Sequence, residues 1–435
     1  AGSSLDGGSS PEMVDALTSA VQCSQPVSVV AVGTHPTLTL EAVGMLRNFG
    51  FASGENVQVR RTLGITYKCT VFPDMCGGDA AKDGASAGGD PIAELIGPFD
   101  APPAYETYTM ARIVEVLQVV ARGLQAGGLD ILVCTSPFVV CGVLQKVTGA
   151  PLLAFFGLPL LWKRPTDLFD NATAHAEFWG LLEHLHAQPH VVMATNNPLL
   201  SEQIAFQAPG PALPVIRPHA LFTQATYVPT RLQEAMLISR TKFLWVTLGC
   251  AIRHFMPEGY PVAFTIANSD SRLPFREMAA HRAAVLVPWE HALMAFFEFY
   301  SMSVPLLMPD ASWAYRLVFD AEGNLGSTTG QYEDVSPKCD PIQGCSKVAH
   351  PHPPFRFQSL ESRRYWYQYS SFAQFPHIQT FSSLADMLNK LLTVDLIQVS
   401  ALMKGFNDLT VVRSAAFWRR AARTMLAGRQ GCAER

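Results

Sequence analysis

Two glutamates, Glu290 and Glu298, lie in a stretch of sequence that is otherwise almost entirely apolar. Residues 283–310 read AAVLVPWEHALMAFFEFYSMSVPLLMPD, which predicts a strand, a turn, a helix and a second strand. The helix around Glu298 is apolar on nearly every face, so it should be buried. A buried carboxylate needs a hydrogen-bonding partner, which sugar hydroxyls could supply. An ion pair inside the core is the alternative.

The turn at Pro288–Glu290 should place the start of this helix at the carboxyl edge of a sheet, where open α/β folds bind ligands. Backbone N–H groups in the first turn of a helix lack intrahelical partners and favour a phosphate. The donors would here be His291, Ala292 and Leu293. Glu290 and Glu298 would lie about 12 Å apart along the helix axis, comparable to the span from ribose to hexose in a nucleotide-sugar.

The pair Glu290 and Glu298, followed by FYSMSVPLLMP, resembles the Glu-x7-Glu donor-site motif of retaining GT-B glycosyltransferases, and is similar to glycosyltransferase family 4. Pro305 matches the proline of that motif, whereas its usual Ala-Met-Ala is absent. The resemblance implies that Glu298 binds the ribose hydroxyls and that Glu290 binds the donor hexose and is catalytic. It also implies that the amides after Glu290 bind the diphosphate.

The same family usually places an Arg and a Lys after the first strand of its second domain, where they neutralise the diphosphate. We predict that strand at Phe243–Leu248, so Arg253 is the candidate for this role, and no Lys stands beside it. The alternative is that Arg253 is an ordinary surface residue.

Small and polar residues follow three predicted strands of the first half of the chain. Gly33 would let a ligand approach closely, and Thr34 and His35 follow it. His35 can donate, accept or shuttle a proton, so it is the second candidate catalytic residue. Ser136 and Asn196 follow later strands and suit the hydroxyls of an acceptor. The alternative is that these residues belong to turns or cap helices.

The order of apolar segments predicts two α/β domains, each a doubly wound, Rossmann-like sheet, facing a cleft in the GT-B manner and followed by C-terminal helices. The expected parts are a flexible tail (1–24), an acceptor domain (25–215) with an insertion (73–104), a nucleotide-sugar domain (216–408) with a long loop (322–354), and a C-terminal helix (409–435). Predicted strands are Val27–Gly33, Asp130–Cys134, Leu152–Phe156, Val191–Ala194, Phe243–Leu248, Val262–Ile266, Ala284–Val287 and Pro305–Met308.

Composition narrows the class of protein. The 435 residues are 49% hydrophobic and 16% charged, with a net charge of −4, which excludes a disordered chain and gives no basic surface for nucleic acid. No apolar run is long enough to span a membrane. We find no G-x-G-x-x-G, P-loop or Asp-x-Asp, so we expect a site without metal or cofactor.

The cysteines and the start of the chain bear on its compartment. Cys69 and Cys76, and Cys339 and Cys345, are close enough in loop-like sequence to form disulfides, which would indicate the ER or Golgi lumen or secretion. The sequon at Asn171 agrees with that compartment. Free thiols in a cytoplasmic protein are the alternative. Because the chain starts with Ala1 in a Gly/Ser-rich tail, we expect a processed or truncated product.

These observations predict a retaining, metal-independent hexosyltransferase that moves a sugar from a UDP- or GDP-sugar to a glycan, glycoprotein or lipid acceptor. Two alternatives stay open. One is a GT-B-shaped protein without turnover that binds glycans or a partner enzyme. The other is a nucleotide-sugar epimerase, which would need an acid and a base across the cleft.

Overall fold

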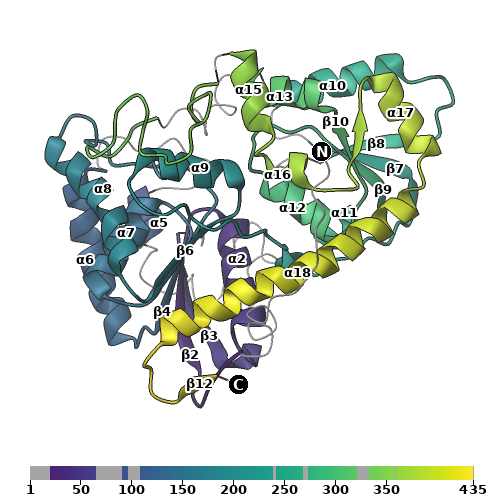
Figure 1. The fold of residues 1–435 in the computed structure, drawn as a ribbon. Helices are drawn as coiled ribbons and strands as arrows, with labels where there is room; N and C mark the ends of the chain where they lie inside the picture. The colour runs from purple at the N-terminus through teal and green to yellow at the C-terminus, as the bar shows by residue number, and fades with distance from the viewer. Residues whose placement is uncertain are drawn as a thin grey trace.

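The computed structural model describes residues 20–64, 91–96, 108–238, 242–267, 273–320, 333–357 and 359–434. They form two domains, each built on a five-stranded sheet, joined by a linker and by a long C-terminal helix (Figure 1). Both domains are Rossmann-like, so the predicted fold class is confirmed. No helix within these ranges is long and apolar enough to cross a membrane.

The first sheet is parallel throughout, in the order β3-β2-β4-β5-β6. Its strands are β2 (Val27–Val32), β3 (Val57–Leu63), β4 (Ile131–Cys134), β5 (Leu152–Phe156) and β6 (Val191–Thr195). The helices that connect and cover them are α2 (Pro36–Met45), η1 (Leu46–Gly50), η2 (Gly54–Asn56), α5 (Pro91–Ile96), α6 (Met110–Ala126), α7 (Phe138–Thr148), α8 (Ala172–Ala187) and α9 (Pro198–Gln207). Both faces are covered, which explains why β2, β4 and β5 are buried along their whole length.

The second sheet repeats this topology in the order β11-β10-β9-β7-β8, again parallel. Its strands are β7 (Arg231–Ile238), β8 (Ala263–Ala267), β9 (His281–Leu286), β10 (Leu306–Pro309) and β11 (Gln379–Phe381). Its helices are α10 (Lys242–Phe255), α11 (Phe275–Met278), α12 (Met294–Ser301), α13 (Ala311–Asp320), α15 (Leu360–Tyr367), α16 (Ser371–Gln374) and α17 (Leu384–Thr393). The linker between the domains contains the short helix η3 (Leu221–Thr223).

One predicted strand was wrong. Phe243–Leu248 is not a strand but part of the helix α10. A short apolar run fits a buried strand and a helix equally well, and the true first strand, β7, is exposed in its first half and so lacked a continuous apolar signal. The insertion 73–104 contains a helix, α5, and its other residues lie outside the described ranges.

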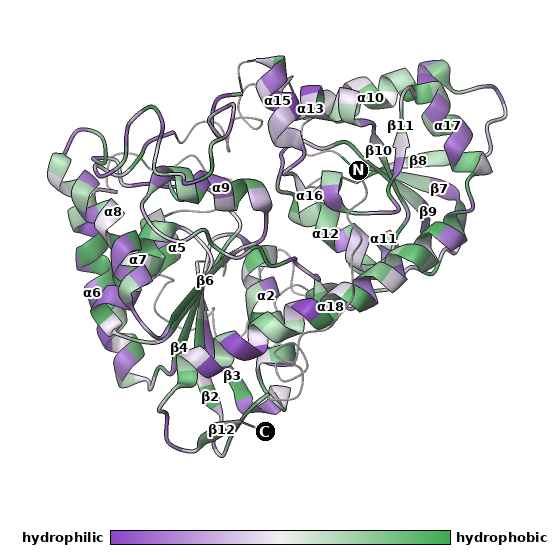
Figure 2. Cartoon of the chain, in the orientation of Figure 1, coloured by the Kyte–Doolittle hydropathy of each residue, from purple (hydrophilic) through white to green (hydrophobic). Residues whose placement is uncertain are grey.

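The C-terminal helix is also longer than predicted. Helix α18 (Leu396–Leu426) is one continuous helix of 31 residues that starts in the second domain and ends on the first (Figure 1). Near its end, Trp418 packs against Phe155 of β5 with ring centroids 5.7 Å apart. In Figure 2 the first sheet is green, whereas α18 shows green and purple along its length, as expected of a helix that is buried on one side.

The two ends of the described chain meet beside the first sheet. β1 (Val21–Cys23) pairs antiparallel with β12 (Cys432–Glu434), and Cys23 and Cys432 form a disulfide. The predicted tail therefore includes an ordered strand. The Cys339–Cys345 disulfide is present as predicted, Cys134–Cys141 was not foreseen, and Cys69 and Cys76 lie outside the described residues.

Candidate functional site

Both sheets have the strand order of a doubly wound fold, in which the order of the strands reverses between the first and third strand of the domain. Ligands bind at this switch point, outside the carboxyl ends of the strands. In the first domain it lies between β2 and β4, and in the second between β7 and β9. The loops after β2, β4 and β9 hold most of the predicted site residues.

In the first domain, polar residues that follow β2 lie within hydrogen-bond distance of residues that follow β4. The hydroxyl groups of Thr34 and Ser136 lie 3.3 Å apart, and those of Thr39 and Thr135 lie 2.9 Å apart. A side chain on Gly33 would overlap the hydroxyls of both Thr39 and Thr135. The small size of Gly33, predicted to admit a ligand, therefore makes room for two threonines of its own domain.

His35 is the N-cap of α2. Its Nδ1 accepts a hydrogen bond from the Leu38 amide at 3.4 Å and lies 3.2 Å from the Thr37 hydroxyl. A neutral imidazole that accepts at Nδ1 carries its proton on Nε2. In this tautomer the ring can donate from Nε2, and it must give up the cap before Nδ1 can take a proton from a substrate.

Two asparagines after β6 connect the first domain with the second. Asn196 is buried, its Nδ2 lies 3.8 Å from the sulfur of Met294, and its Oδ1 has no hydrogen-bond partner among the described residues. Asn197 caps α9 through Oδ1, and its Nδ2 donates to the His291 carbonyl at 3.2 Å and to the Ser371 hydroxyl at 2.9 Å. Asn197 thus fixes the loop after β9 against the first domain.

In the second domain, the helix after β9 begins later than predicted. Leu293 is the N-cap of α12, so Glu290, His291 and Ala292 lie in a bend before the helix. The amides of the first helical turn belong to Met294 and Ala295, and the Leu293 side chain makes no cap hydrogen bond to them. The predicted helical spacing between Glu290 and Glu298 was therefore wrong.

His291 is buried in this bend. Burial lowers the pKa of its imidazole to about 3, so the ring is neutral at physiological pH. The ring lies 5.8 Å from that of Phe357, between centroids. A neutral imidazole can donate or accept a hydrogen bond here but adds no positive charge for a phosphate.

A hollow between the domains opens beside this bend. Its volume, including the part open to solvent, is about 310 Å³. The second domain contributes Glu290, His291 and Ala292, and the first contributes Gly157, Leu158, Pro159, Asn197, Leu199, Leu200 and Gln203. The structure therefore brings Glu290, His291 and Ala292 to the interdomain pocket, whereas Glu298 and His35 are not among its lining residues.

Glu298 instead interacts electrostatically with a carboxylate of the first domain, Glu41 of α2. The pKa of Glu298 is raised to about 7, mainly by burial and to a smaller extent by the charge of Glu41. Glu41 is 1% exposed, and burial raises its pKa to about 7 as well. The Glu41 Oε1 accepts from the His219 amide at 2.6 Å, and its Oε2 has no partner among the described residues.

The linker beside this pair is held by a polar network. The Arg217 guanidinium donates to Thr410 and Asn407 of α18 and lies over the ring of Phe375, 4.4 Å from its centroid. His219 Nε2 lies 2.8 Å from the Ser414 hydroxyl. Burial lowers the pKa of His219 to about 3, so its ring is neutral. The linker is thus tied to both domains.

Arg253 lies away from the pocket. It is on the last turn of α10, exposed, and its guanidinium lies 3.4 Å from the Cys250 sulfur. Helix α10 starts after the carboxyl end of β7 and ends before the amino end of β8. Its last turn is therefore at the opposite edge of the sheet from Glu290, and Arg253 cannot neutralise a diphosphate bound there.

Sequence reasoning missed several residues of this region. Glu41 is an isolated acid in an apolar helix, the same signal that drew attention to Glu298. Leu158, Leu199 and Gln203 gave no signal, because their place in the pocket depends on how the two domains pack.

No protein-family model matches this chain, and no curated protein matches it. Similar solved structures include the glycosyltransferase VinC in complex with DTDP, at 11% identity and a TM-score of 0.38, covering 92% of this chain and 100% of that one. MurG of Acinetobacter baumannii has 9% identity and a TM-score of 0.35, covering 91% and 95%. The glycosyltransferase SnogD from Streptomyces nogalater has 11% identity and a TM-score of 0.35, and the match covers 85% of this chain and 99% of that one. At these values the similarities assign neither a family nor an activity.

Proposed function

We propose that the chain is a glycosyltransferase that moves a sugar from a nucleoside diphosphate donor to a hydroxyl acceptor. The observation that carries this proposal is the position of Glu290, which lies at the switch point of the second sheet in a pocket with walls from both domains. A carboxylate there suits the hydroxyls of a donor hexose, and the facing loops of the first domain suit an acceptor.

In the proposed reaction, the bond between the anomeric carbon and the diphosphate oxygen breaks, and the acceptor oxygen bonds to that carbon. The acceptor hydroxyl gives its proton to a base, for which His35 is the candidate. The amides of Met294 and Ala295, which start α12, would stabilise the charge on the departing diphosphate without a metal. Retention of the anomeric configuration, a UDP- or GDP-sugar donor, and a glycan, glycoprotein or lipid acceptor are parts of the same proposal.

Nucleotide binding tests the donor site. We would measure the melting temperature with UDP, GDP, ADP, CMP and dTDP for the wild type, for Glu290→Gln, and for Glu258→Gln as an exposed control. The expected result is that one nucleoside diphosphate and its sugar stabilise the wild type and the control. The nucleotide-sugar should stabilise Glu290→Gln less, because that variant loses charged hydrogen bonds to the hexose.

Catalysis is then tested by incubating the protein with the stabilising nucleotide-sugar and measuring release of the nucleoside diphosphate. Release by the wild type that falls by 10-fold or more in Glu290→Gln would support the assignment, since 10-fold corresponds to about 1.4 kcal/mol. If no nucleotide stabilises a well-folded wild type, the donor site is wrong.

A second candidate function is a binding protein of the same fold without turnover. The observation in its favour is the distance of Arg253 from the pocket, together with the neutral state of His291. Nucleotide binding without release of nucleoside diphosphate, across the tested donors, would support this candidate.

A further inference from the structure

The segment 333–357, which we call the strap, belongs to the second domain in sequence but lies on the first. It runs between α13 and α15 without helix or strand and passes over α8 and α9 (Figure 1). Two main-chain hydrogen bonds attach it to the end of α9. The Ser336 amide donates to the Gln207 carbonyl, and the Cys345 amide donates to the Phe206 carbonyl, each at 2.7 Å.

Side chains add further contacts between the strap and the first domain. Three pairs of oppositely charged or titratable side chains join it to the first domain. They are His175–Asp334 at 2.7 Å, Lys338–Glu183 at 2.6 Å and His350–Glu202 at 3.0 Å. The rings of Phe206 and Phe355 meet edge to face at 6.1 Å. The polar contacts are individually weak, whereas Val335 and Phe355 are buried against Phe206, so release of the segment must expose this apolar cluster.

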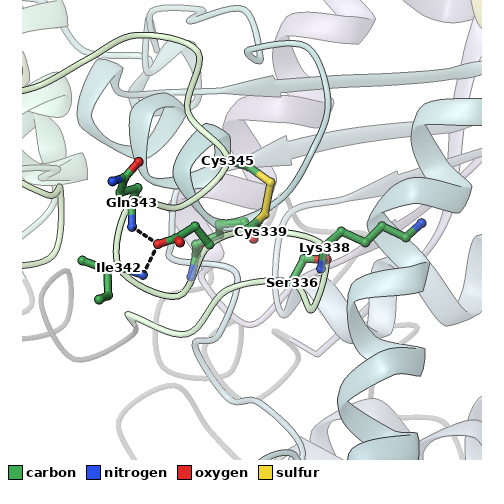
Figure 3. Close-up of a disulfide and its surroundings, with 8 residues drawn as sticks. Ser336, Lys338, Cys339, Ile342, Gln343 and Cys345 are labelled. Carbon is green, nitrogen blue, oxygen red and sulfur yellow. Dashed lines mark hydrogen bonds between the residues drawn. A yellow bond between two sulfur atoms is a disulfide. The ribbon is translucent and has the colours of Figure 1, made fainter.

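Residues 339–345 of the strap, which we call its tip, pack against the end of α9. Cys339 and Cys345 form a disulfide, and Asp340 between them accepts from the amides of Ile342 and Gln343 (Figure 3). Gly344 has a φ of +67°, and a Cβ atom there would lie 2.5 Å from the Phe206 carbonyl oxygen. A larger residue at this position cannot keep the tip seated on α9.

Helix α9 is also one wall of the interdomain pocket. Its residues Leu199, Leu200 and Gln203 face the bend of Glu290. The strap holds this wall directly, since Gln203 Nε2 donates to the Pro354 carbonyl at 3.0 Å. A nucleoside diphosphate sugar, with a base, two sugar rings and a diphosphate, exceeds a hollow of about 310 Å³ that includes space open to solvent.

We propose that the strap is a gate, and that its release from α9 opens the cleft between the domains to a nucleotide-sized ligand. Redocking would then close the pocket around the ligand. Helix α18 spans the two domains separately from the strap and would keep them joined while the strap is released. The identity of the ligand rests on the proposed function, whereas the opening itself does not.

The variant Gly344→Val tests the gate, because the valine side chain would collide with Phe206 and prevent the tip from packing on α9. The matched control is Gly259→Val, since Gly259 has a similar φ of +73° but no atom within 4 Å of its Cβ position. We would measure small-angle scattering and hydrogen exchange without ligand. The expected result is a larger radius of gyration and at least 10-fold faster exchange of the Ser336 amide in Gly344→Val. Unchanged values relative to the control would overturn the proposal.

If Gly344→Val does not fold, the double variant Glu202→Gln with Asp334→Asn removes the negative charge from two of the strap contacts and should show the same changes to a smaller degree. The opposite manipulation uses a carbodiimide to join Lys338 to Glu183 and lock the strap. Binding of UDP, GDP and dTDP should become several-fold slower in the locked protein and faster in the open variants. Equal binding rates in locked and unlocked protein would also overturn the gate.

The outcomes separate the gate from the proposed function. If the variants open but none of the nucleotides binds any form, the gate stands and the glycosyltransferase assignment fails. If nucleotides bind with unchanged strap exchange, the assignment stands and the gate fails.

Discussion

Glu298 of α12 and Glu41 of α2 come from different domains, and the charge of Glu41 raises the pKa of Glu298. Burial is the larger cause of the raised pKa at both residues. Two buried carboxyl groups that repel each other in this way are most stable when at least one is protonated. The packing of the two domains is therefore linked to proton uptake.

The first prediction is that Glu41 lowers the free energy of unfolding as the pH rises from about 4.5 to above 7, opposite in sign to the contributions of the buried, neutral His219 and His291. The folded protein holds the Glu41 proton with a pKa of about 7, against an ordinary value of 4.5, so its contribution is complete below 4.5 and is lost as the pH passes 7. The loss attributable to Glu41 is on the order of 3 kcal/mol. Urea unfolding at pH 5 and pH 8 measures it.

The control for this effect is Glu41→Gln, which keeps the shape of the side chain but does not titrate. From pH 5 to pH 8, the change in its free energy of unfolding should be more positive than that of the wild type, because the variant lacks the Glu41 loss. Equal changes in the two proteins would show that other groups cause the pH dependence.

The second prediction concerns His35, which caps α2 and is the candidate base. His35→Asn should keep the cap, because Asn is a preferred N-cap residue, and should lose any proton transfer. His35→Ala should lose both, with a decrease in stability of about 1 kcal/mol. Donor turnover and thermal unfolding of the two variants distinguish the roles. Full activity in a stable His35→Asn protein would exclude His35 as the base.

The third prediction concerns Asn197, which caps α9 and binds the loop of His291. Asn197→Ser should retain a cap acceptor but lose both hydrogen bonds to the second domain, because its side chain is shorter. We expect a decrease in stability of about 1–3 kcal/mol and weaker stabilisation by nucleotide. Calorimetry with and without nucleotide measures both. A matched control is Asn171→Ser, at the N-cap of α8, where the Asn171 side chain accepts from the amides of Thr173 and Ala174 and donates to Asp167 of the same domain.

The sequence was sufficient for much of the fold and for part of the site. Apolar runs such as those of β4 and β5 are buried on both faces and were predicted within about two residues, which is normal for element boundaries. The proline-containing bend at Glu290 was placed at the correct sheet edge. These features depend on local pattern.

The remaining features depend on contacts between distant segments. The first half of β7 is exposed, so its strand pattern was weak, and the neighbouring apolar run of α10 was taken for the strand. Leu293, rather than Glu290, is the N-cap of α12, and the bend before it is joined to the first domain by the hydrogen bond from Asn197 to the His291 carbonyl. Periodicity cannot predict such a contact, which joins residues 94 positions apart.

The last prediction concerns the disulfide between Cys23 and Cys432, which closes a loop with a sequence separation of 409 residues. Such a cross-link restricts the unfolded chain, so its removal should destabilise the protein by about 2–5 kcal/mol. The change to test is Cys23→Ser with Cys432→Ser, compared with Cys250→Ser, which removes an exposed free thiol. Thermal unfolding under oxidising conditions should show a lower Tm for the double variant and an unchanged Tm for the control. The difference should disappear when the wild type is reduced. Equal Tm values in oxidised wild type and double variant would mean that β1 and β12 stay paired without the covalent bond, and that α18 alone holds the C-terminus on the first domain.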